Sequence, residues 1–478
     1  MTHGAEEKLA PVEPVAVTDQ TDRRPRGGRR RRRIVFIEAA TGAAVIVTAM
    51  ALVATSLSGG ERQAGRVSHG PNPSVVEVPL GDGALHLIAD VHDVGDNGSL
   101  TPGSGTVAGL VRSETAFGLA LTSQLAAQAH GGNVVDSPLS ADLALSMLEL
   151  GATGSTETGI AQALQTGTLS PSAQAAAWAD LQAALASPDG AAMEVANSAW
   201  LQEGDSFVPA YLDELARAYG NDAYLADLAR RPAQAAAAIN AWVSDHTGGR
   251  IRQLLSPDDL GAYTVFVLLN ALNFSASWAP DINMSKATET FTADDGSASS
   301  VPAIENDSQG LALPAAVTAA YTAVEIPYAG GRYQAIVIEP AAGTISQLIQ
   351  HLDTSRLDAV LASLRSEQVA LTMPALNLAV TQNLDSVLSN LGMDQAFGPA
   401  ADLSGISPQA GQVALVEQAD DLTVNQTGTK FSAATGIVGV ATAVQCCIRQ
   451  VTIDRPYLFL LQDKTTGLIL ADSVIAQP

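Results

Sequence analysis

Residues 424–435 carry the most distinctive residue types of the chain, because small and weakly polar side chains fill their middle. The segment has neither an amphipathic stripe nor a tight-turn signal. Such a segment can lie exposed and can also fit as a strand inside a sheet. Elsewhere the sequence has no zinc-protease helix, phosphate-binding loop, dinucleotide-binding turn or nucleophile elbow, so no pattern for catalysis accompanies it.

Strand alternation tests whether this segment and its continuation could be buried. From residue 429 onward, one face would carry only small or apolar side chains, namely Thr429, Phe431, Ala433, Thr435, Ile437, Gly439 and Ala441. The opposite face would hold the single charge, with Lys430, Ser432, Ala434, Gly436, Val438, Val440 and Thr442. A strand with this pattern can bury its first face in a sheet.

The composition indicates a large packed core and an acidic surface. Apolar residues make up 47% of the chain and charged residues 15%, which argues against global disorder. After residue 57 the chain has 16 basic and 43 acidic residues, so we expect neither nucleic acid nor a heparin-like polyanion as a partner. The two cysteines, Cys446 and Cys447, are adjacent and are not expected to staple the fold with a disulfide.

The N-terminal part of the chain predicts a membrane anchor. Eight arginines lie between residues 23 and 33, and residues 34–57 follow with one charge, Glu38. Residues 39–57 are 19 uncharged residues, about the length that spans a bilayer core. Arginine clusters stay cytoplasmic, so we expect the N-terminus inside the plasma membrane and residues 58–478 outside it. A cleaved signal peptide is the alternative, although its apolar region would be shorter, about 7–15 residues.

The chain is expected to divide into four parts. Residues 1–33 are a disordered basic tail, 34–57 the transmembrane anchor, 58–111 an extracellular linker, and 112–478 one structured domain. Apolar spacing predicts helices over residues 115–127, 140–151, 157–164, 173–185, 209–219, 233–246, 345–364 and 384–391. Strands are predicted over residues 195–201, 265–274, 321–326, 333–338 and 369–380, with a short one at 84–91. Helices dominate the first half and strands the second, which predicts an α+β fold.

Motifs along residues 112–478 resemble, in the same order, those of the serpin family. They include Ser137 and Ser140 within residues 133–154, Asn240 and Trp242 within 239–251, residues 270–274 with Trp278, Pro374, residues 391–406, Asp454-Arg455-Pro456 and residues 466–470. Residues 424–435 resemble the hinge of the serpin reactive loop. Residues 454–459 resemble the strand that follows that loop.

The resemblance implies the serpin fold, with three β-sheets, about eight to nine helices and an exposed reactive loop. It also implies a suicide substrate: a serine protease cleaves the loop and forms an acyl-enzyme, and the loop inserts into the central sheet before hydrolysis. The implied hinge is Gly428, Thr429, Lys430, Phe431, Ser432, Ala433, Ala434 and Thr435. The usual spacing from Gly428 implies a scissile bond between Thr442 and Ala443, and a shift of that bond toward Gln445 or Cys446 is the alternative. Ser137, Ser140, Asn270 and Trp278 are implied at the shutter and breach, where the central sheet opens.

Small and aliphatic residues around the scissile bond favour an elastase-like or subtilisin-like protease. Four residues depart from the family pattern: Phe431 stands in place of Ala, Lys430 and Gln426 in place of Glu, and Gln418 in place of a shutter His. The alternative function is a non-inhibitory binding or structural module on the membrane surface. A third, an envelope hydrolase, is disfavoured because its motif is absent. We expect a monomer that is not an enzyme and needs no cofactor or metal.

Overall fold

The computed structural model describes residues 44–55, 76–80, 83–87, 105–186, 191–306, 310–428 and 448–478, which lie in one compact unit, Thr41–Pro478. Its helices are α1 (Gly105–Ala129), α2 (Pro138–Glu149), α3 (Gly154–Ala163), α4 (Pro171–Leu185), α5 (Pro209–Tyr219), α6 (Pro232–His246), α7 (Ile345–Gln350), α8 (Thr354–Ser363) and α9 (Asp385–Leu388). A proline opens α2, α4, α5 and α6, where a missing N–H costs no hydrogen bond.

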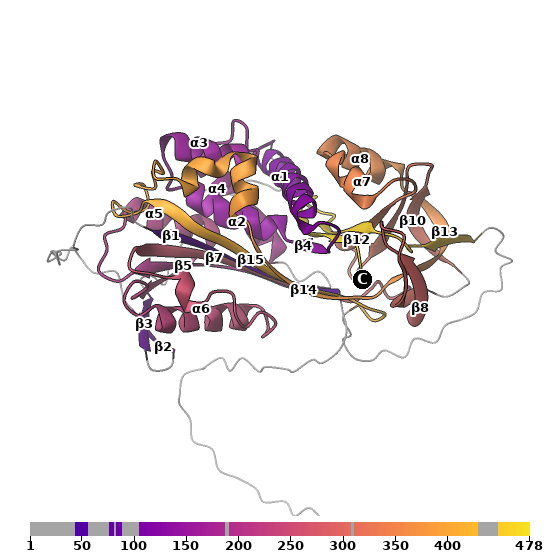
Figure 1. The fold of residues 1–478 in the computed structure, drawn as a ribbon, viewed down its shortest axis with the longest axis horizontal. Coiled ribbons are helices and arrows are strands. Elements are labelled where there is room, and N and C mark those ends of the chain that lie inside the picture. Colours follow the sequence, from indigo (N-terminus) through magenta and orange to yellow (C-terminus); the bar gives the residue numbers. More distant parts are fainter. Residues whose placement is uncertain are drawn as a thin grey trace, which may run out of the picture. The chain divides into compact units, whose positions relative to one another are not determined.

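The first sheet, which we call the central sheet, has eight strands in the order β14-β15-β1-β7-β5-β6-β3-β2 (Figure 1). Its strands are β1 (Ala44–Thr55), β2 (Val76–Leu80), β3 (Gly83–Leu87), β5 (Ala191–Gln202), β6 (Asp222–Ala226), β7 (Thr264–Ala276), β14 (Leu376–Asn383) and β15 (Gln412–Val424). The hairpin of β2 and β3 comes from the expected linker and pairs with β6 at the sheet edge.

The second sheet has ten strands in the order β4-β18-β17-β12-β11-β10-β13-β9-β8, with β16 paired to β13. They are β4 (Val134–Asp136), β8 (Met284–Thr292), β9 (Ala298–Asn306), β10 (Leu311–Val317), β11 (Tyr321–Pro327), β12 (Tyr333–Pro340), β13 (Arg365–Pro374), β16 (Arg449–Thr452), β17 (Tyr457–Asp463) and β18 (Ile469–Ile475). Among the described residues the strands thus join into two sheets, not the three expected. The reason is that β10 pairs with both β11 and β13.

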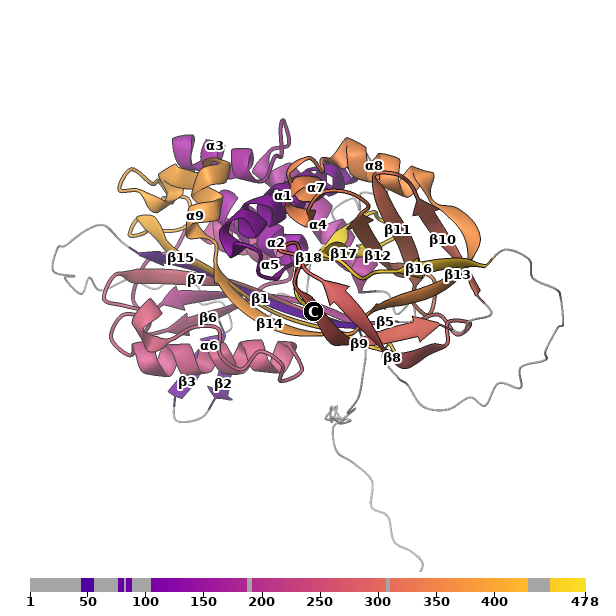
Figure 2. The ribbon, with the colours of Figure 1, turned by 45° about the vertical axis from the view of Figure 1, so that its right-hand side comes forward.

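Helices cover both faces of the central sheet (Figures 1 and 2). The larger core includes α2 and alternate residues of β7, such as Leu268 and Leu272. The smaller core lies between α6 and the central sheet. It includes the β7 residues that point to the opposite face, such as Leu269 and Ala271. The strand predicted over residues 265–274 is therefore confirmed, and it is buried on both faces.

Residues 44–55 form a strand, whereas the hydropathy predicts the second half of a transmembrane helix. No helix in the described ranges is long and apolar enough to cross a membrane. β1 lies between β7 and β15, antiparallel to both, so its backbone has hydrogen-bonding strands on two sides. Uncharged, β-branched-rich sequence suits a doubly buried strand as well as a bilayer, which explains the different outcome. Residues 34–43, 56 and 57 lie outside the described part of the chain.

Two elements predicted as continuous are divided. The helix expected over residues 345–364 is α7 and α8, because Asp353 starts a new helix by accepting a hydrogen bond from the backbone N–H of Arg356 at 2.8 Å. The strand expected over residues 369–380 is β13 in the second sheet and β14 in the central sheet. The chain changes sheets directly after Pro374, which cannot donate a ladder hydrogen bond.

Candidate functional site

The breach is the end of the central sheet where residues 425–428 leave β15. Trp278 lies two residues past β7 and is 4% exposed. Its indole Nε1 donates a hydrogen bond to the carbonyl oxygen of Asn425 at 2.9 Å. The indole also stacks on Tyr328, with ring centroids 4.7 Å apart and planes 10° from parallel. Trp278 therefore ties the start of the segment after β15 to the end of β7.

Gly428 completes this contact by lying directly on the end of β7. It forms an isolated antiparallel bridge with Ser277, and its φ of +55° is in the left-handed region. A Cβ atom at this position would lie 2.2 Å from the backbone nitrogen of Trp278. Both the backbone conformation and the close approach require glycine here. The chain that follows Gly428 therefore starts from a fixed point beside β7.

The other implied residues of the reactive loop lie outside the described part of the chain. These are Thr429, Lys430, Phe431, Ser432, Ala433, Ala434 and Thr435 of the hinge, and Thr442 and Ala443 at the scissile bond. The described chain resumes at residue 448, next to β16 in the second sheet. The segment between residues 428 and 449 thus connects the two sheets.

At the shutter, Ser137 contacts both Ser140 and Gln418 where α2 begins. Ser137 caps α2: its hydroxyl accepts from the Ser140 N–H at 3.2 Å and donates to the Leu470 carbonyl at 2.6 Å. The Gln418 side chain on β15 donates to the Ser137 carbonyl at 3.2 Å. These contacts of the Ser137 hydroxyl with backbone atoms of α2 and β18 indicate a structural role for it.

Asn270 of β7 lies on the same face but bonds away from the serines. Its amide donates to Asn197 Oδ1 on β5 at 2.9 Å. In the strand register, Asn270 and Gln418 each pair with Met50 of β1, one from either side. Both Asn270 Oδ1 and Gln418 Oε1 are buried, and neither has a hydrogen-bond partner among the described residues. The structure thus brings Ser137, Ser140 and Gln418 together, while Met50 separates this group from Asn270.

A buried carboxyl pair lies near the shutter, and no sequence motif marks it. Asp136 of β4 stands opposite Asp472 of β18, and the Thr122 hydroxyl donates to Asp472 Oδ2 at 2.6 Å. Burial and the charge of Asp472 raise the pKa of Asp136 well above its usual range. Burial raises the pKa of Asp472 to about 6. The pair therefore holds a proton close to neutral pH.

Two further carboxyl groups on α2 are shifted in the same direction. Asp142 accepts hydrogen bonds from the Ser146 hydroxyl at 2.8 Å and from Trp178 Nε1 at 3.2 Å, yet its burial raises its pKa to about 7. Burial raises the pKa of Glu149, which accepts a hydrogen bond from Gln174, to about 8. We therefore expect the stability of helix α2 and of the sheet that it supports to depend on pH.

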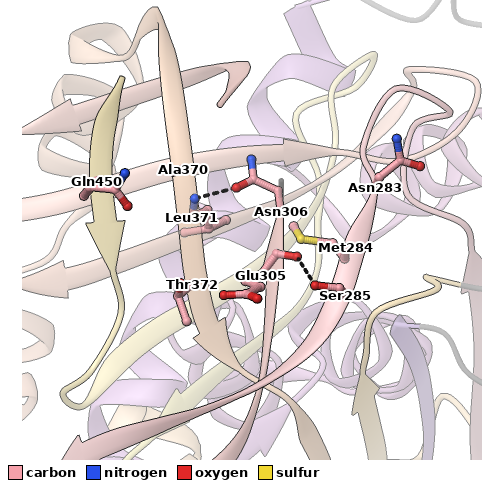
Figure 3. A pocket seen from close by; sticks show the side chains of 9 residues that line it. All are labelled: Asn283, Met284, Ser285, Glu305, Asn306, Ala370, Leu371, Thr372 and Gln450. Atoms are coloured by element: carbon pink, nitrogen blue, oxygen red, sulfur yellow. Dashed lines mark hydrogen bonds between the residues drawn. The ribbon is translucent and has the colours of Figure 1, made fainter. Parts of the chain in front are cut away.

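A pocket of about 490 Å³ lies between β8, β9, β13 and β16 (Figure 3). It is lined by Asn283, Met284, Ser285, Glu305, Asn306, Ala370, Leu371, Thr372 and Gln450. Asn306 crosses from β9 to accept a hydrogen bond from the Leu371 N–H at 2.7 Å. Glu305 is the only ionisable side chain in this lining, and the Ser285 hydroxyl donates to its backbone carbonyl at 3.5 Å and not to its carboxylate. This arrangement gives no support to a hydrolase.

The family comparison covers the region that contains the breach and the shutter. A family model described as Serpin (serine protease inhibitor) matches residues 112–478. An uncharacterised serpin-like protein of Thermococcus kodakarensis is 30% identical over 360 residues, which cover 71% of this chain and 80% of that protein. Neuroserpin of Gallus gallus is 26% identical over 377 residues, which cover 74% of this chain and 88% of neuroserpin.

Solved structures share the fold. Tengpin, a thermophilic serpin in its native state, gives a TM-score of 0.66 at 23% identity, with 77% of this chain and 94% of tengpin covered. Native protease nexin-1 with heparin gives a TM-score of 0.67 at 24% identity, with 78% of this chain and all of the nexin chain covered. The predicted α+β architecture of the serpin type is confirmed.

Proposed function

The chain belongs to the serpin family, and from this premise we propose that it inhibits a serine protease as a suicide substrate. The observation that carries the proposal is the way in which the chain leaves the central sheet. Gly428 is fixed on the end of β7, and the next described element along the chain is β16 of the second sheet. The segment that joins Gly428 to β16 can be cleaved by a protease in its later part. Its earlier part, next to Gly428, can insert into the central sheet.

The proposed reaction begins as ordinary proteolysis. The protease serine attacks the carbonyl carbon of Thr442, the amine of Ala443 leaves, and an ester joins the protease to Thr442. The freed loop then inserts as a strand, starting next to Gly428, and carries the protease with it. Inhibition depends on insertion being faster than hydrolysis of the ester.

The loop sequence supports insertion because the face beginning at Thr429 is small or apolar. Phe431 is the exception in size. A bulky ring at an early buried position costs roughly 1–3 kcal/mol by overpacking, which slows the first steps of insertion. Lys430 falls on the opposite face and can stay in solvent. We therefore propose an inhibitor that also releases some cleaved, inactive product.

The target is proposed to be an elastase-like or subtilisin-like protease. Residues 440–444 are Val, Ala, Thr, Ala and Val, and small or aliphatic side chains fit the shallow specificity pockets of such enzymes. Arg449, which a trypsin-like enzyme would prefer, belongs to β16 and not to the loop.

We also propose that residues 34–57 can anchor the chain in the plasma membrane, with the N-terminus in the cytoplasm. The support is the uncharged run of 19 residues after Glu38 and the arginine cluster before it. In that placement residues 44–55 would be a helix in the bilayer and not β1. The two positions exclude each other.

A non-inhibitory module remains the second candidate function, and one observation favours it. β1 fills the position between β7 and β15, so the loop has nowhere to insert while β1 is in place.

Incubation of the full-length chain with a panel of serine proteases tests the proposed function. A covalent complex that survives denaturing electrophoresis, with cleavage after Thr442 by mass spectrometry, is the expected result. Replacing Thr442 with Arg should transfer complex formation to a trypsin-like protease. Cleavage without any complex, under every condition that frees the position between β7 and β15, would establish the non-inhibitory alternative.

A further inference from the structure

The gap between β7 and β15, which we call the insertion slot, is filled by a segment from the N-terminal part of the same chain. β1 pairs with β15 from Val45 to Thr55 and with β7 from Ala44 to Thr55. We infer that residues 44–55 are a built-in occupant that keeps the reactive loop out of the central sheet until they are withdrawn. The consequence for inhibition rests on the proposed function, but the position of the strand does not.

The direction of β1 matches what the loop itself would need. Ala44 pairs with Ala276 at the breach, one residue before Ser277, which forms the bridge to Gly428. From there β1 runs antiparallel to β15 and ends at Thr55, opposite Gln412. A strand that starts just after Gly428 and turns back along β15 would follow the same path from the same end. The two segments therefore compete for one place.

The described side chains of β1 hold it in the slot by apolar packing. Met50 and Leu52 are both fully buried in the core on the α2 side of the sheet. Leu52 lies opposite Leu268 of β7 and Val416 of β15, which belong to the same core. An apolar strand in this position therefore completes the core.

Met50 lies in a row that is otherwise made of side-chain amides. Across the sheet the register reads Gln382, Gln418, Met50, Asn270 and Asn197. A thioether has no hydrogen to donate, and the two amide oxygens that flank it are buried without a partner in the described ranges. If β1 leaves and β7 moves next to β15, Asn270 and Gln418 become neighbours that can bond to each other. The two amide side chains that flank Met50 therefore favour the state in which β1 has left the insertion slot. This opposes the apolar packing of β1 and allows β1 to leave and return.

A cross-link in the full-length chain tests where residues 44–55 lie. Cys446 and Cys447 are first replaced by Ser, and Ala49 is then changed to Cys together with Ala271→Cys or, in a second variant, Ala419→Cys. Ala49 pairs directly with both partners in the register. The matched control joins Ala49→Cys with Ala276→Cys, since Ala276 pairs with Ala44, five residues or about 17 Å away, beyond disulfide reach.

The expected result is a disulfide in at least one of the two test variants and none in the control, without any protease present. On exposure to an elastase-like or subtilisin-like protease, the oxidised variant should yield only cleaved chain. The reduced form, and the variant Met50→Asp, which places a carboxylate between two amide oxygens, should form at least tenfold more covalent complex. Met50→Leu is the control for Met50→Asp and should behave as the parent chain.

The outcomes separate this inference from the proposed function. No cross-link above the control in either test variant overturns the placement, whatever the protease does. A cross-linked chain that forms as much covalent complex as its reduced form overturns the blocking role. A cross-link with no complex in the oxidised, reduced or Met50→Asp forms leaves the strand in place but rejects inhibition, and the blocking role with it.

Discussion

Asn270 and Gln418 stand on either side of Met50 in one row of the central sheet, and neither side-chain oxygen has a hydrogen-bond partner within the part of the chain that the structure describes. A buried acceptor left without its donor costs about 1–3 kcal/mol. Apolar burial of Met50 and Leu52 stabilises the same arrangement, at roughly 1.5–3 kcal/mol for each fully buried side chain. The cost of the two oxygens is therefore similar in size to what these two side chains contribute.

Replacing Met50 tests this balance. Met50→Ala should lower the free energy of unfolding by about 2–5 kcal/mol, because it leaves a cavity in the core. Met50→Gln should cost at least about 1 kcal/mol less than Ala, because its amide can donate to Asn270 Oδ1 or Gln418 Oε1. Denaturant unfolding of the full-length chain measures both. If Gln were as damaging as Ala, the two orphan oxygens would not matter energetically.

Gly428→Ala should loosen the breach. The new Cβ would meet the backbone of Trp278 at 2.2 Å, so the bridge to Ser277 must open, at an expected cost of about 1–3 kcal/mol in unfolding free energy. A change in Trp278 fluorescence should accompany it. Gly220→Ala is the matched control, since Gly220 has a similar φ of +60° but no atom within 4 Å of the place that a Cβ would occupy. Equal effects at both sites would mean that backbone strain alone, and not the contact with β7, is responsible.

Stability should fall as pH rises from about 4 to about 8. The folded-state pKa of Asp142 is about 7 against an ordinary 3.8, and that of Glu149 is about 8 against 4.5. The folded chain therefore binds these protons more tightly than the unfolded chain, and each group contributes at most about 1.4 kcal/mol per pH unit within its window. Denaturant unfolding at pH 5 and pH 8 measures the difference.

Asp142→Asn should flatten this pH dependence, because a neutral amide has no proton to lose. Asp213→Asn, at an exposed position of α5, is the control and should keep the slope of the parent chain. A parent chain that gained stability between pH 5 and pH 8 would contradict the shifts assigned to α2.

Phe431→Ala should raise the yield of covalent complex relative to cleaved inhibitor. Removing the ring takes away an overpacking cost of roughly 1–3 kcal/mol at an early inserted position, so insertion competes better with hydrolysis. Densitometry of a denaturing gel gives the ratio. Lys430→Ala, on the opposite face of the strand, is the neighbouring control and should change the ratio little. An unchanged ratio for Phe431→Ala would show that this side chain does not limit the inhibitor.

The membrane proposal predicts that the full-length chain floats with vesicles of phosphatidylcholine and phosphatidylglycerol in a density gradient. Met50→Asp should reduce this association, since a carboxylate near the middle of residues 39–57 costs about 2.5–3.5 kcal/mol in a bilayer. Ser58→Asp, just past the apolar run, should float as the parent does. A purified mature chain that begins near residue 55 would instead identify a cleaved signal peptide.

Local sequence signals predict those parts of the fold that do not depend on which distant segment packs against them. The helix expected over residues 209–219 has these same bounds as α5, because Pro209 can open a helix and Gly220 ends it in the left-handed conformation. The apolar run at residues 265–274 predicts β7, because a strand buried on both faces needs apolar residues at every position.

The parts that sequence reasoning misses depend on distant partners. An uncharged run such as residues 44–55 has the same composition whether lipid or two strands surround it, and its partners β7 and β15 lie far along the chain. Asp472 meets Thr122 across 350 residues, so no local pattern announces the carboxyl pair. The available signal was an Asp, followed by Ser473, inside the mostly apolar run of β18, where a buried charge must find a partner or a proton.

Filling the insertion slot also affects how copies of the chain meet. Two strands with a gap between them present two open edges, and a strand from a neighbouring molecule can pair with both. With β1 seated between β7 and β15, those edges are already paired within the molecule. A strand from a neighbouring molecule therefore finds no unpaired edge at this position while β1 is in place.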